Sequence, residues 1–322
     1  MSYRHAHHSR FPIHASNPDY LEVTPQDARL MRQAPLHLQV VGGGFVRFKA
    51  SGQTLDELGI APQDQPRRLY LHRQDHEAAV SDIQRAMLDG MFRDMVKQGD
   101  QATIKQAFTS LVEEAFLEPR LSTLMGFQGM VETFVEEYSL APHLLRAFLL
   151  VASEGYDLTE HSVNVMALVA GCALRMGHAK PRVVDYCLAG LLHDVGKTKL
   201  DEHLRMPARS LRQHEFSRYK LHPLEGQKIL RQGAGIPQPV LDAAAQHHER
   251  LDGSGYPKGI REVSEAGQVV GLADSYELLT RNNSGGRKHL PPLESLSLLK
   301  KEADEQKFSL DVFRHFAHSL AS

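Results

Sequence analysis

The chain has 322 residues, about twice the length of a typical domain, so we expect one large domain and a smaller one. Its 37 Lys and Arg residues against 39 Asp and Glu give a net charge of −2, which excludes a basic, nucleic-acid-coating protein and predicts no polymeric nucleic acid as a partner. Two cysteines exclude a disulfide framework and favour a reducing, cytoplasmic setting, and no apolar run reaches the roughly 18 residues of a membrane span.

The first hundred residues divide into two segments that differ in composition. Residues 1–35 are polar and interrupted by prolines, so we expect a flexible leader. After it, LHLQVV and FVRFKA flank three glycines at 42–44, which predicts two strands joined by a glycine turn. A short helix at 54–58 and a third strand at 68–72 complete a small α/β module over 36–95, and its position ahead of the helical half predicts a regulatory role.

Helical periodicity dominates from about residue 80 onward. Methionines recur every four residues at 87, 91 and 95, and the 3.6-residue period continues through Phe108, Val112 and Phe116. We assign residues 96–150 to a helical connector, whose apolar faces either pair two subunits in a homodimer or pack on neighbouring helices. Residues 151–322 lack strand-like alternation, so the predicted fold class is mainly α with a small N-terminal α/β module.

Five short signals in the helical half carry metal-binding side chains. They are His161, the pair His193-Asp194 at the end of an apolar helix, His222 before a proline, the doublet His247-His248, and Asp274 inside an apolar run. Taken singly, each histidine has a structural alternative, such as a hydrogen-bonded core residue. An unpaired carboxylate inside an apolar run is costly, so Asp274 is harder to explain that way.

Together these residues indicate a metal centre. Imidazoles and carboxylates in this mixture suit divalent transition metals, and five His with two Asp exceed what one tetrahedral zinc needs. They fit two metal ions that share a bridging carboxylate, a centre that can hold a nucleophilic hydroxide and polarise a phosphate. Lys197, three residues after Asp194, is a cation suited to contact that phosphate.

At these residues the sequence resembles a known family. The run His193-Asp194-Val195-Gly196-Lys197 is similar to the signature of the HD superfamily of metal-dependent phosphohydrolases. The run from His247 to Pro257, HHERLDGSGYP, and the KLHPLEG segment at 220–226 resemble the HD-GYP subgroup. The resemblance extends from about residue 156 to about residue 299, and it makes 151–322 an HD-GYP catalytic domain.

The resemblance implies a helical bundle around two or three metal ions, usually iron or manganese, and hydrolysis of cyclic di-GMP to pGpG and, in some members, to GMP. It implies Asp194 as the bridging metal ligand and Lys197 as the group that steadies a phosphate. The remaining metal ligands that it implies are His161, His193, His222, His247, His248 and Asp274. Asp157 stands where three-metal members place a longer Glu, so a third ion stays open, and an N-cap role for Asp157 is the alternative.

Substrate contacts are predicted in two loops. Tyr256 offers a ring and a hydroxyl to a nucleotide, although a helix-terminating turn with an anchoring aromatic is the alternative. After the last metal ligand the family carries an arginine-rich loop that resembles SDRPYRK, whereas this chain has TRNNSGGRK at 280–288. Arg287 and Lys288 align with the second basic pair, and Arg281 is a candidate for the missing arginine. The predicted metal centre is complete, and the predicted substrate clamp is altered.

Three functions follow in order of preference. The complete ligand set and Lys197 favour a cyclic di-GMP phosphodiesterase. The altered loop at 280–288 motivates the alternative, a non-catalytic or weakly active sensor that binds a cyclic dinucleotide or a partner protein. An HD phosphohydrolase acting on ordinary nucleotides is a third possibility, against which the GYP run argues.

Overall fold

The computed structural model describes residues 17–76, 101–117, 121–140, 158–205, 211–233, 235–281 and 289–321, together with positions 78, 79, 82, 83, 86 and 90. The chain divides into two compact units, Met1–Met91 and Phe92–Ser322. Each unit has its own hydrophobic core, and each is described by itself.

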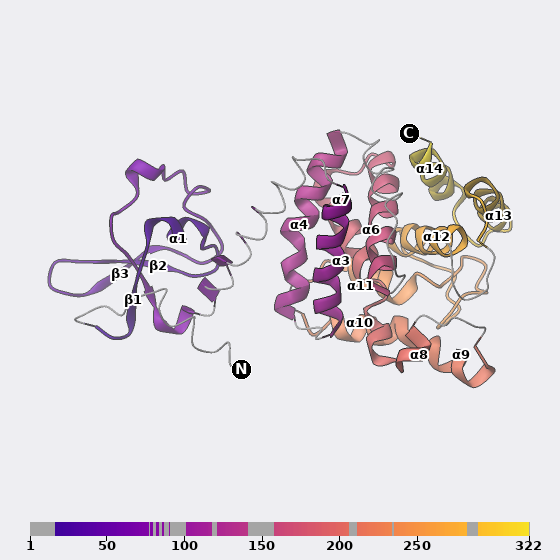
Figure 1. Ribbon diagram of the computed structural model, residues 1–322, viewed down its shortest axis with the longest axis horizontal. Helices are drawn as coiled ribbons and strands as arrows, with labels where there is room; N and C mark the ends of the chain where they lie inside the picture. Colours follow the sequence, from indigo (N-terminus) through magenta and orange to yellow (C-terminus); the bar gives the residue numbers. More distant parts are fainter. Residues whose placement is uncertain are drawn as a thin grey trace. The chain divides into compact units, whose positions relative to one another are not determined.

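The N-terminal unit, in which Figure 1 labels β1, β2, β3 and α1, is a four-stranded antiparallel sheet. Its strand order is β1-β4-β2-β3. Its strands are β1 (Tyr20–Val23), β2 (Leu36–Gln39), β3 (Phe45–Lys49) and β4 (Leu69–His72). A short helix, α1 (Pro25–Leu30), joins β1 to β2, and two single 3-10 turns, η3 (Pro62–Asp64) and η4 (Arg73–Asp75), flank β4. Leu21, Val23, Leu36 and Leu71 point into the core of this unit.

The predicted glycine hairpin is confirmed. Strands β2 and β3 pair antiparallel, and the turn between them holds Gly42 at φ 103° and Gly43 at φ 88°. These left-handed values are strained for other residues, so the glycines are needed where the chain reverses. The predicted strand at 68–72 is confirmed as β4.

Two expectations for this unit are wrong. Residues 1–35 are not a leader throughout, because β1 pairs with β4 and α1 begins at a Thr24 cap that accepts the N–H of Asp27 at 3.1 Å. The predicted helix at 54–58 is a single turn instead. Thr54 caps that turn by accepting the N–H of Glu57 at 3.2 Å, but the chain leaves the helical conformation at Gly59, where φ is +72°.

The C-terminal unit is a bundle of helices, and no strand occurs among its described residues. Its elements are α3 (Gln101–Leu117), α4 (Leu121–Leu140), α6 (Leu158–Arg175), α7 (Lys180–Leu192), η5 (Val195–Lys199), α8 (Glu202–Arg205), α9 (Gln213–Tyr219), α10 (His222–Leu230), α11 (Gln238–Gln246), α12 (Glu265–Thr280), α13 (Pro292–Asp304) and α14 (Leu310–Leu320). Helix α6 is central, since α3, α7, α12 and α14 all pack against it (Figure 1). The predicted fold class, mainly α with a small N-terminal α/β module, is confirmed.

Helices α3 and α4 belong to the same core as the helices that follow them. Phe108 and Val112 of α3 and Phe134 of α4 are buried in one cluster with side chains of α6, α7 and α12. Of the two roles predicted for the connector at 96–150, packing on neighbouring helices is therefore observed, and the homodimer stays a prediction. The methionines at 87, 91 and 95 lie outside the described residues.

Several of the predicted metal-ligating residues lie at the ends of helices. Helix α7 ends at Leu192, so His193 and Asp194 fall in the turn that follows, and α11 ends at Gln246, directly before the histidine doublet. Helix α10 begins at His222 with a proline in its first turn, a position where the missing N–H costs nothing. Among the described residues, no helix combines the length and the apolar character needed to cross a lipid bilayer.

Candidate metal centre

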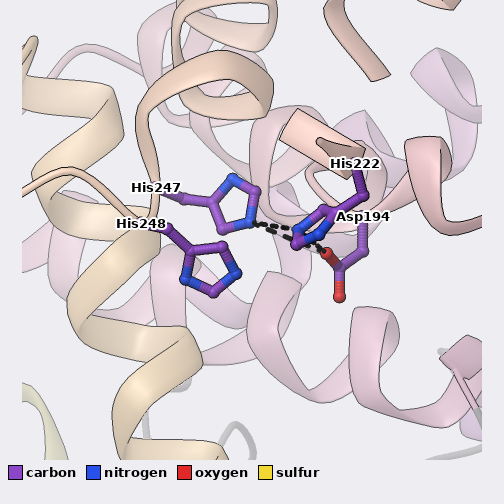
Figure 2. Close-up of side chains that lie close together, drawn as sticks. All are labelled: Asp194, His222, His247 and His248. Atoms are coloured by element: carbon purple, nitrogen blue, oxygen red, sulfur yellow. Dashed lines mark hydrogen bonds and ion pairs between the residues drawn. The ribbon is translucent and has the colours of Figure 1, made fainter. Parts of the chain in front are cut away.

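Asp194 lies at the centre of four imidazoles that come from four different segments. Its Oδ2 is 3.4 Å from Nε2 of His161 and 3.3 Å from Nε2 of His193. Its Oδ1 is 3.1 Å from Nε2 of His222 and 3.6 Å from Nε2 of His247, and the rings of these two histidines point at the carboxylate (Figure 2). All five residues are fully buried.

The donor atoms form two groups that share one carboxylate. The first group contains Asp194, His222, His247 and His248, and the second contains His161, His193 and Asp194. Within each group the candidate ligand atoms all lie within 4.8 Å of one another. Because Asp194 belongs to both groups, the geometry matches a pair of cation sites bridged by a single carboxylate.

Asp274 joins this centre from α12. Its Oδ1 is 3.2 Å from Nε2 of His161, and its Oδ2 is 3.8 Å from Nδ1 of His248. The carboxylate that the apolar run made difficult to explain is therefore buried beside both donor groups. Seven of the eight predicted metal-ligating residues come together, and the eighth, Asp157, lies outside the described residues.

Most of these imidazoles are fixed by a hydrogen bond at Nδ1, on the side of the ring that faces away from the centre. In four rings the Nδ1 atom faces an oxygen that can only accept, so Nδ1 carries the proton and Nε2 points inward. The pairs are His161 with Glu277 Oε2 at 2.8 Å, His193 with Gly190 O at 2.7 Å, His222 with Tyr219 O at 2.8 Å and His247 with Ala243 O at 2.9 Å. Hydrogen bonds of this kind fix the tautomer and the ring orientation of metal-ligating histidines.

Burial keeps several of the rings neutral. It lowers the pKa of His222 to about 4, and it lowers the pKa of His193 and His248 as well. Neutral imidazole is the form that binds a metal ion. His161 differs, because the carboxylates of Glu277, Asp194 and Asp274 outweigh its burial and raise its pKa well above the usual value.

The two aspartates stay ionised. Burial alone would raise the pKa of Asp194, but His193 and Lys197 outweigh it and hold that pKa well below its usual range. Burial is likewise outweighed at Asp274, whose pKa is lowered mainly by His161. Lys197 Nζ lies 2.5 Å from Asp194 Oδ2, so in this structure its charge faces the carboxylate. The pKa of Lys197 is raised because Asp194 outweighs the effect of burial.

Buried polar atoms at the centre show that the donor set suits a cation. Apart from the ion pair between Oδ2 and Lys197, neither carboxylate oxygen of Asp194 has a hydrogen-bond partner among the described residues, and neither has Nε2 of His248. Two pairs of Nε2 atoms face each other, at 3.2 Å between His222 and His247 and at 3.3 Å between His161 and His193. Because unsatisfied buried polar atoms are costly, this arrangement fits a site that is completed by metal ions.

Two glycines allow the segments to approach this closely. A Cβ at Gly196 would lie 1.9 Å from the backbone oxygen of His222, and one at Gly271 would lie 2.2 Å from that of His247. Any side chain at these positions would push η5 away from α10, or α12 away from the end of α11. The glycines therefore set the spacing between residues that contribute donors to the centre.

The loop after the histidine doublet folds back onto it. The ring of Tyr256 stacks on His248 with centroids 4.5 Å apart, and its backbone N–H donates to His248 O at 3.0 Å. Glu249 holds the far side of the loop by accepting the N–H groups of Lys258 at 2.7 Å and Ile260 at 3.1 Å. Tyr256, predicted as a substrate contact, therefore lies directly against the metal centre.

Comparison with known proteins agrees with this geometry. The family model for the HD domain matches residues 149–312, slightly more than half of the chain and the whole of the metal centre. The chain belongs to the HD domain family. Its GYP loop places it in the HD-GYP group, as the sequence resemblance indicates. The HD domain binds divalent metal ions, which fits the two donor groups around Asp194.

Several curated relatives share this domain. A cyclic di-GMP phosphodiesterase of Pseudomonas aeruginosa is 29% identical over 219 residues, which cover 67% of this chain and 52% of the relative. A cyclic di-GMP phosphodiesterase of Thermotoga maritima is 30% identical over 189 residues, 57% of this chain and 51% of the relative. A 3′3′-cGAMP-specific phosphodiesterase of Vibrio cholerae is 30% identical over 133 residues, 38% of this chain and 28% of the relative. The chain thus spans about half the length of the first two relatives.

A solved structure shares the fold. An HD-GYP-type protein from Bdellovibrio bacteriovorus superimposes with a TM-score of 0.62 at 19% identity. The match covers 94% of this chain and all of the other one. The two proteins therefore share a fold.

Some residues of the HD-GYP centre were not predicted from the sequence, and others cannot be placed. Glu277, which orients His161, was missed although it lies three residues after Asp274 and so on the same helix face. Arg287 and Lys288, the predicted phosphate contacts, lie outside the described residues. Arg281 directly follows α12, and burial lowers its pKa to about 8.

Proposed function

We propose that the chain is a metal-dependent phosphodiesterase that hydrolyses cyclic di-GMP to linear pGpG, with GMP as a further product. The observation that carries this proposal is the sharing of Asp194 between two buried groups of donors. The names of the relatives from P. aeruginosa and T. maritima support the choice of substrate. The buried, reduced Cys172 and Cys187 are consistent with a cytoplasmic enzyme, which is part of the proposal.

We assign two divalent ions to the centre, iron or manganese, because both tolerate mixed imidazole and carboxylate ligands. One ion would be held by His161, His193, Asp194 and Asp274, and the other by Asp194, His222, His247 and His248. Asp194 belongs to both donor groups, so it would be the ligand that the two ions share. A third ion would need Asp157 as a ligand.

When bound, the two ions supply Lewis-acid polarisation of the phosphate and a nucleophile at neutral pH. The reaction adds the oxygen of one water to phosphorus and breaks the bond to a ribose 3′-oxygen, which takes up a proton. The product then carries a 5′-phosphate at one end and a 3′-hydroxyl at the other.

The chain itself contributes orientation and charge. Four Nδ1 anchors hold the imidazoles, and Lys197 supplies a fixed positive charge beside Asp194. Because Lys197 is almost fully buried, this charge acts in a low-dielectric environment and is stronger than it would be in water. As negative charge develops on the phosphate, we assign Lys197 to its stabilisation. Tyr256 would form the wall of the site beside His248.

A product assay tests this function. The purified full chain is loaded with Mn²⁺ or, without oxygen, with Fe²⁺ and is incubated with cyclic di-GMP, and pGpG and GMP are separated by chromatography. Cyclic 3′3′-GMP-AMP serves as the comparison substrate, and chelation of the metal should stop the reaction. Absence of turnover with both metals would contradict the proposal, and tight binding without turnover would instead indicate the sensor function.

A further inference from the structure

An exposed aromatic side chain lies beside the metal centre. Phe216 on α9 is 42% exposed, and it is the only aromatic residue among the exposed large hydrophobic side chains of the described residues. A single exposed apolar side chain is common and needs no explanation by itself. The contacts of this ring with its neighbours are what point to a ligand.

Helix α9 and the residue that follows it present three side chains on one face. The helix start is fixed where Glu215 Oε2 accepts the N–H of Arg212 at 2.7 Å. Phe216, Tyr219 and Lys220 then follow at spacings of three and four residues and so share a face. Tyr219 connects this face to the metal centre, because its backbone oxygen accepts the Nδ1 proton of the predicted ligand His222 at 2.8 Å.

A row of rings leads from the predicted metal ligand His248 to the surface. Tyr256 stacks on His248, and the ring of Phe216 meets Tyr256 edge-on, with centroids 6.0 Å apart and planes at 76°. Phe216 is therefore two ring contacts away from His248. Lys220 places its Nζ over the Phe216 ring, 5.1 Å from its centre, so a positive charge lies against one face of this aromatic side chain.

We propose that Phe216 is the stacking platform for one guanine base of the cyclic dinucleotide, with Tyr256 as its inner wall and Lys220 as a nearby positive charge. The assignment rests on the proposed function, since it places the scissile phosphate at the metal ions and the base farther out along the row of rings. Stacking of a base on an aromatic side chain changes affinity by roughly ten- to a hundredfold. A platform of this kind therefore contributes to substrate binding rather than to the chemical step.

Kinetics on the metal-loaded full chain test the platform. We expect Phe216→Leu to raise KM for cyclic di-GMP at least tenfold, with kcat within twofold of wild type and metal content unchanged, while Phe216→Tyr restores KM. Leu293→Ala is the matched control, because Leu293 is 78% exposed on α13, outside the metal centre. An unchanged KM in Phe216→Leu, or a loss of metal that explains the defect, overturns the proposal.

A binding measurement separates this inference from the proposed function. A cyclic dinucleotide with 2-aminopurine in place of one guanine loses fluorescence when the base stacks. If the wild type turns over no cyclic dinucleotide, the phosphodiesterase proposal fails, yet quenching that is lost in Phe216→Leu and kept in Phe216→Tyr still supports the platform. Absence of quenching in the wild type, or equal quenching in Phe216→Leu, overturns it.

Discussion

The two units of the chain each bury aspartates, and they satisfy them in opposite ways. In the N-terminal unit, Oδ2 of Asp82 accepts three backbone N–H groups, from Arg32 at 2.8 Å, Gln33 at 2.6 Å and Ala34 at 3.1 Å. In the bundle, no backbone N–H reaches Asp194, and apart from the ion pair between its Oδ2 and Lys197 neither oxygen has a hydrogen-bond partner among the described residues. A buried carboxylate that the backbone satisfies stabilises the fold, whereas one that lacks backbone donors and is surrounded by imidazoles indicates a site for a cation.

The largest difference between the two units is expected from matched aspartate variants. We expect Asp194→Asn to lower turnover about 1000-fold, since several kcal/mol of charge stabilisation depend on the ions it holds. Asp82→Asn should instead lower the free energy of unfolding by about 2 kcal/mol and leave the metal content of folded protein unchanged. Metal analysis, product assays and chemical denaturation measure the three quantities. Full metal content in Asp194→Asn would contradict the assignment.

Acid should destabilise the metal-free bundle through its neutral histidines. The pKa of His222 is about 4 in the folded chain, below the unfolded value of about 6.5, so the unfolded state binds the proton first. The contribution of His222 to the free energy of unfolding is therefore complete above pH 6.5 and falls as pH drops towards 4, by about 3 kcal/mol at most.

Denaturation of the metal-free protein at several pH values between 4 and 7 checks this dependence. His222→Asn should flatten the slope, and the exposed His289 provides the control, since His289→Asn should keep it. An identical slope in His222→Asn and wild type would show that other groups cause the acid sensitivity.

Glycine variants compare close packing in the two units. Gly271→Ala forces a Cβ against the backbone of His247, so we expect it to lower the free energy of unfolding by about 1–3 kcal/mol and to weaken metal binding. Gly44→Ala in the N-terminal hairpin has only ordinary contact with Val40 at 3.6 Å and should change neither quantity. Thermal unfolding and metal titration give the comparison, and a neutral Gly271→Ala would contradict the packing argument.

Glutamate variants test whether Glu277 orients the His161 ring, and their effect is expected to be the smallest of those described. Glu277→Gln removes the charge behind His161 and should weaken metal binding about 10- to 100-fold. Glu57 in the N-terminal unit accepts a backbone N–H, from Thr54 at 3.0 Å, and no imidazole of the described residues, so Glu57→Gln is a control with the same substitution. Competition with a chelator of known affinity measures both, and equal affinities would assign Glu277 to the fold alone.

Much of the site could be predicted from the sequence because its donors lie at helix ends. A proline marks the start of α10, and the apolar run of α7 stops just before His193. The doublet was harder to interpret, since neighbouring helix positions diverge by about 100°. The structure resolves this difficulty, because α11 ends before His247 and the two rings come within 4.1 Å of each other.

The other features of the fold and site depend on long-range packing, which cannot be inferred from a single sequence. The close approach at Gly196 and Gly271 exists only once η5 meets α10 and α12 meets α11. In the N-terminal unit, β1 has four residues of which only Leu21 and Val23 face the core, too short a pattern to separate from a polar leader. The match of Tyr20 to His72 at the end of β4 is a long-range pairing without a local signal.

The anchored Nδ1 atoms also bear on how readily ions are taken up. A free imidazole rotates about its bond to Cβ and exchanges its proton between two nitrogens, and a ligand that immobilises it loses that freedom at a cost in entropy. In His193, His222 and His247 folding has already selected one rotamer and one tautomer, and in His161 it has selected one rotamer. The centre is thus preorganised, and arriving ions meet a rigid cage whose ordering was completed when the bundle formed.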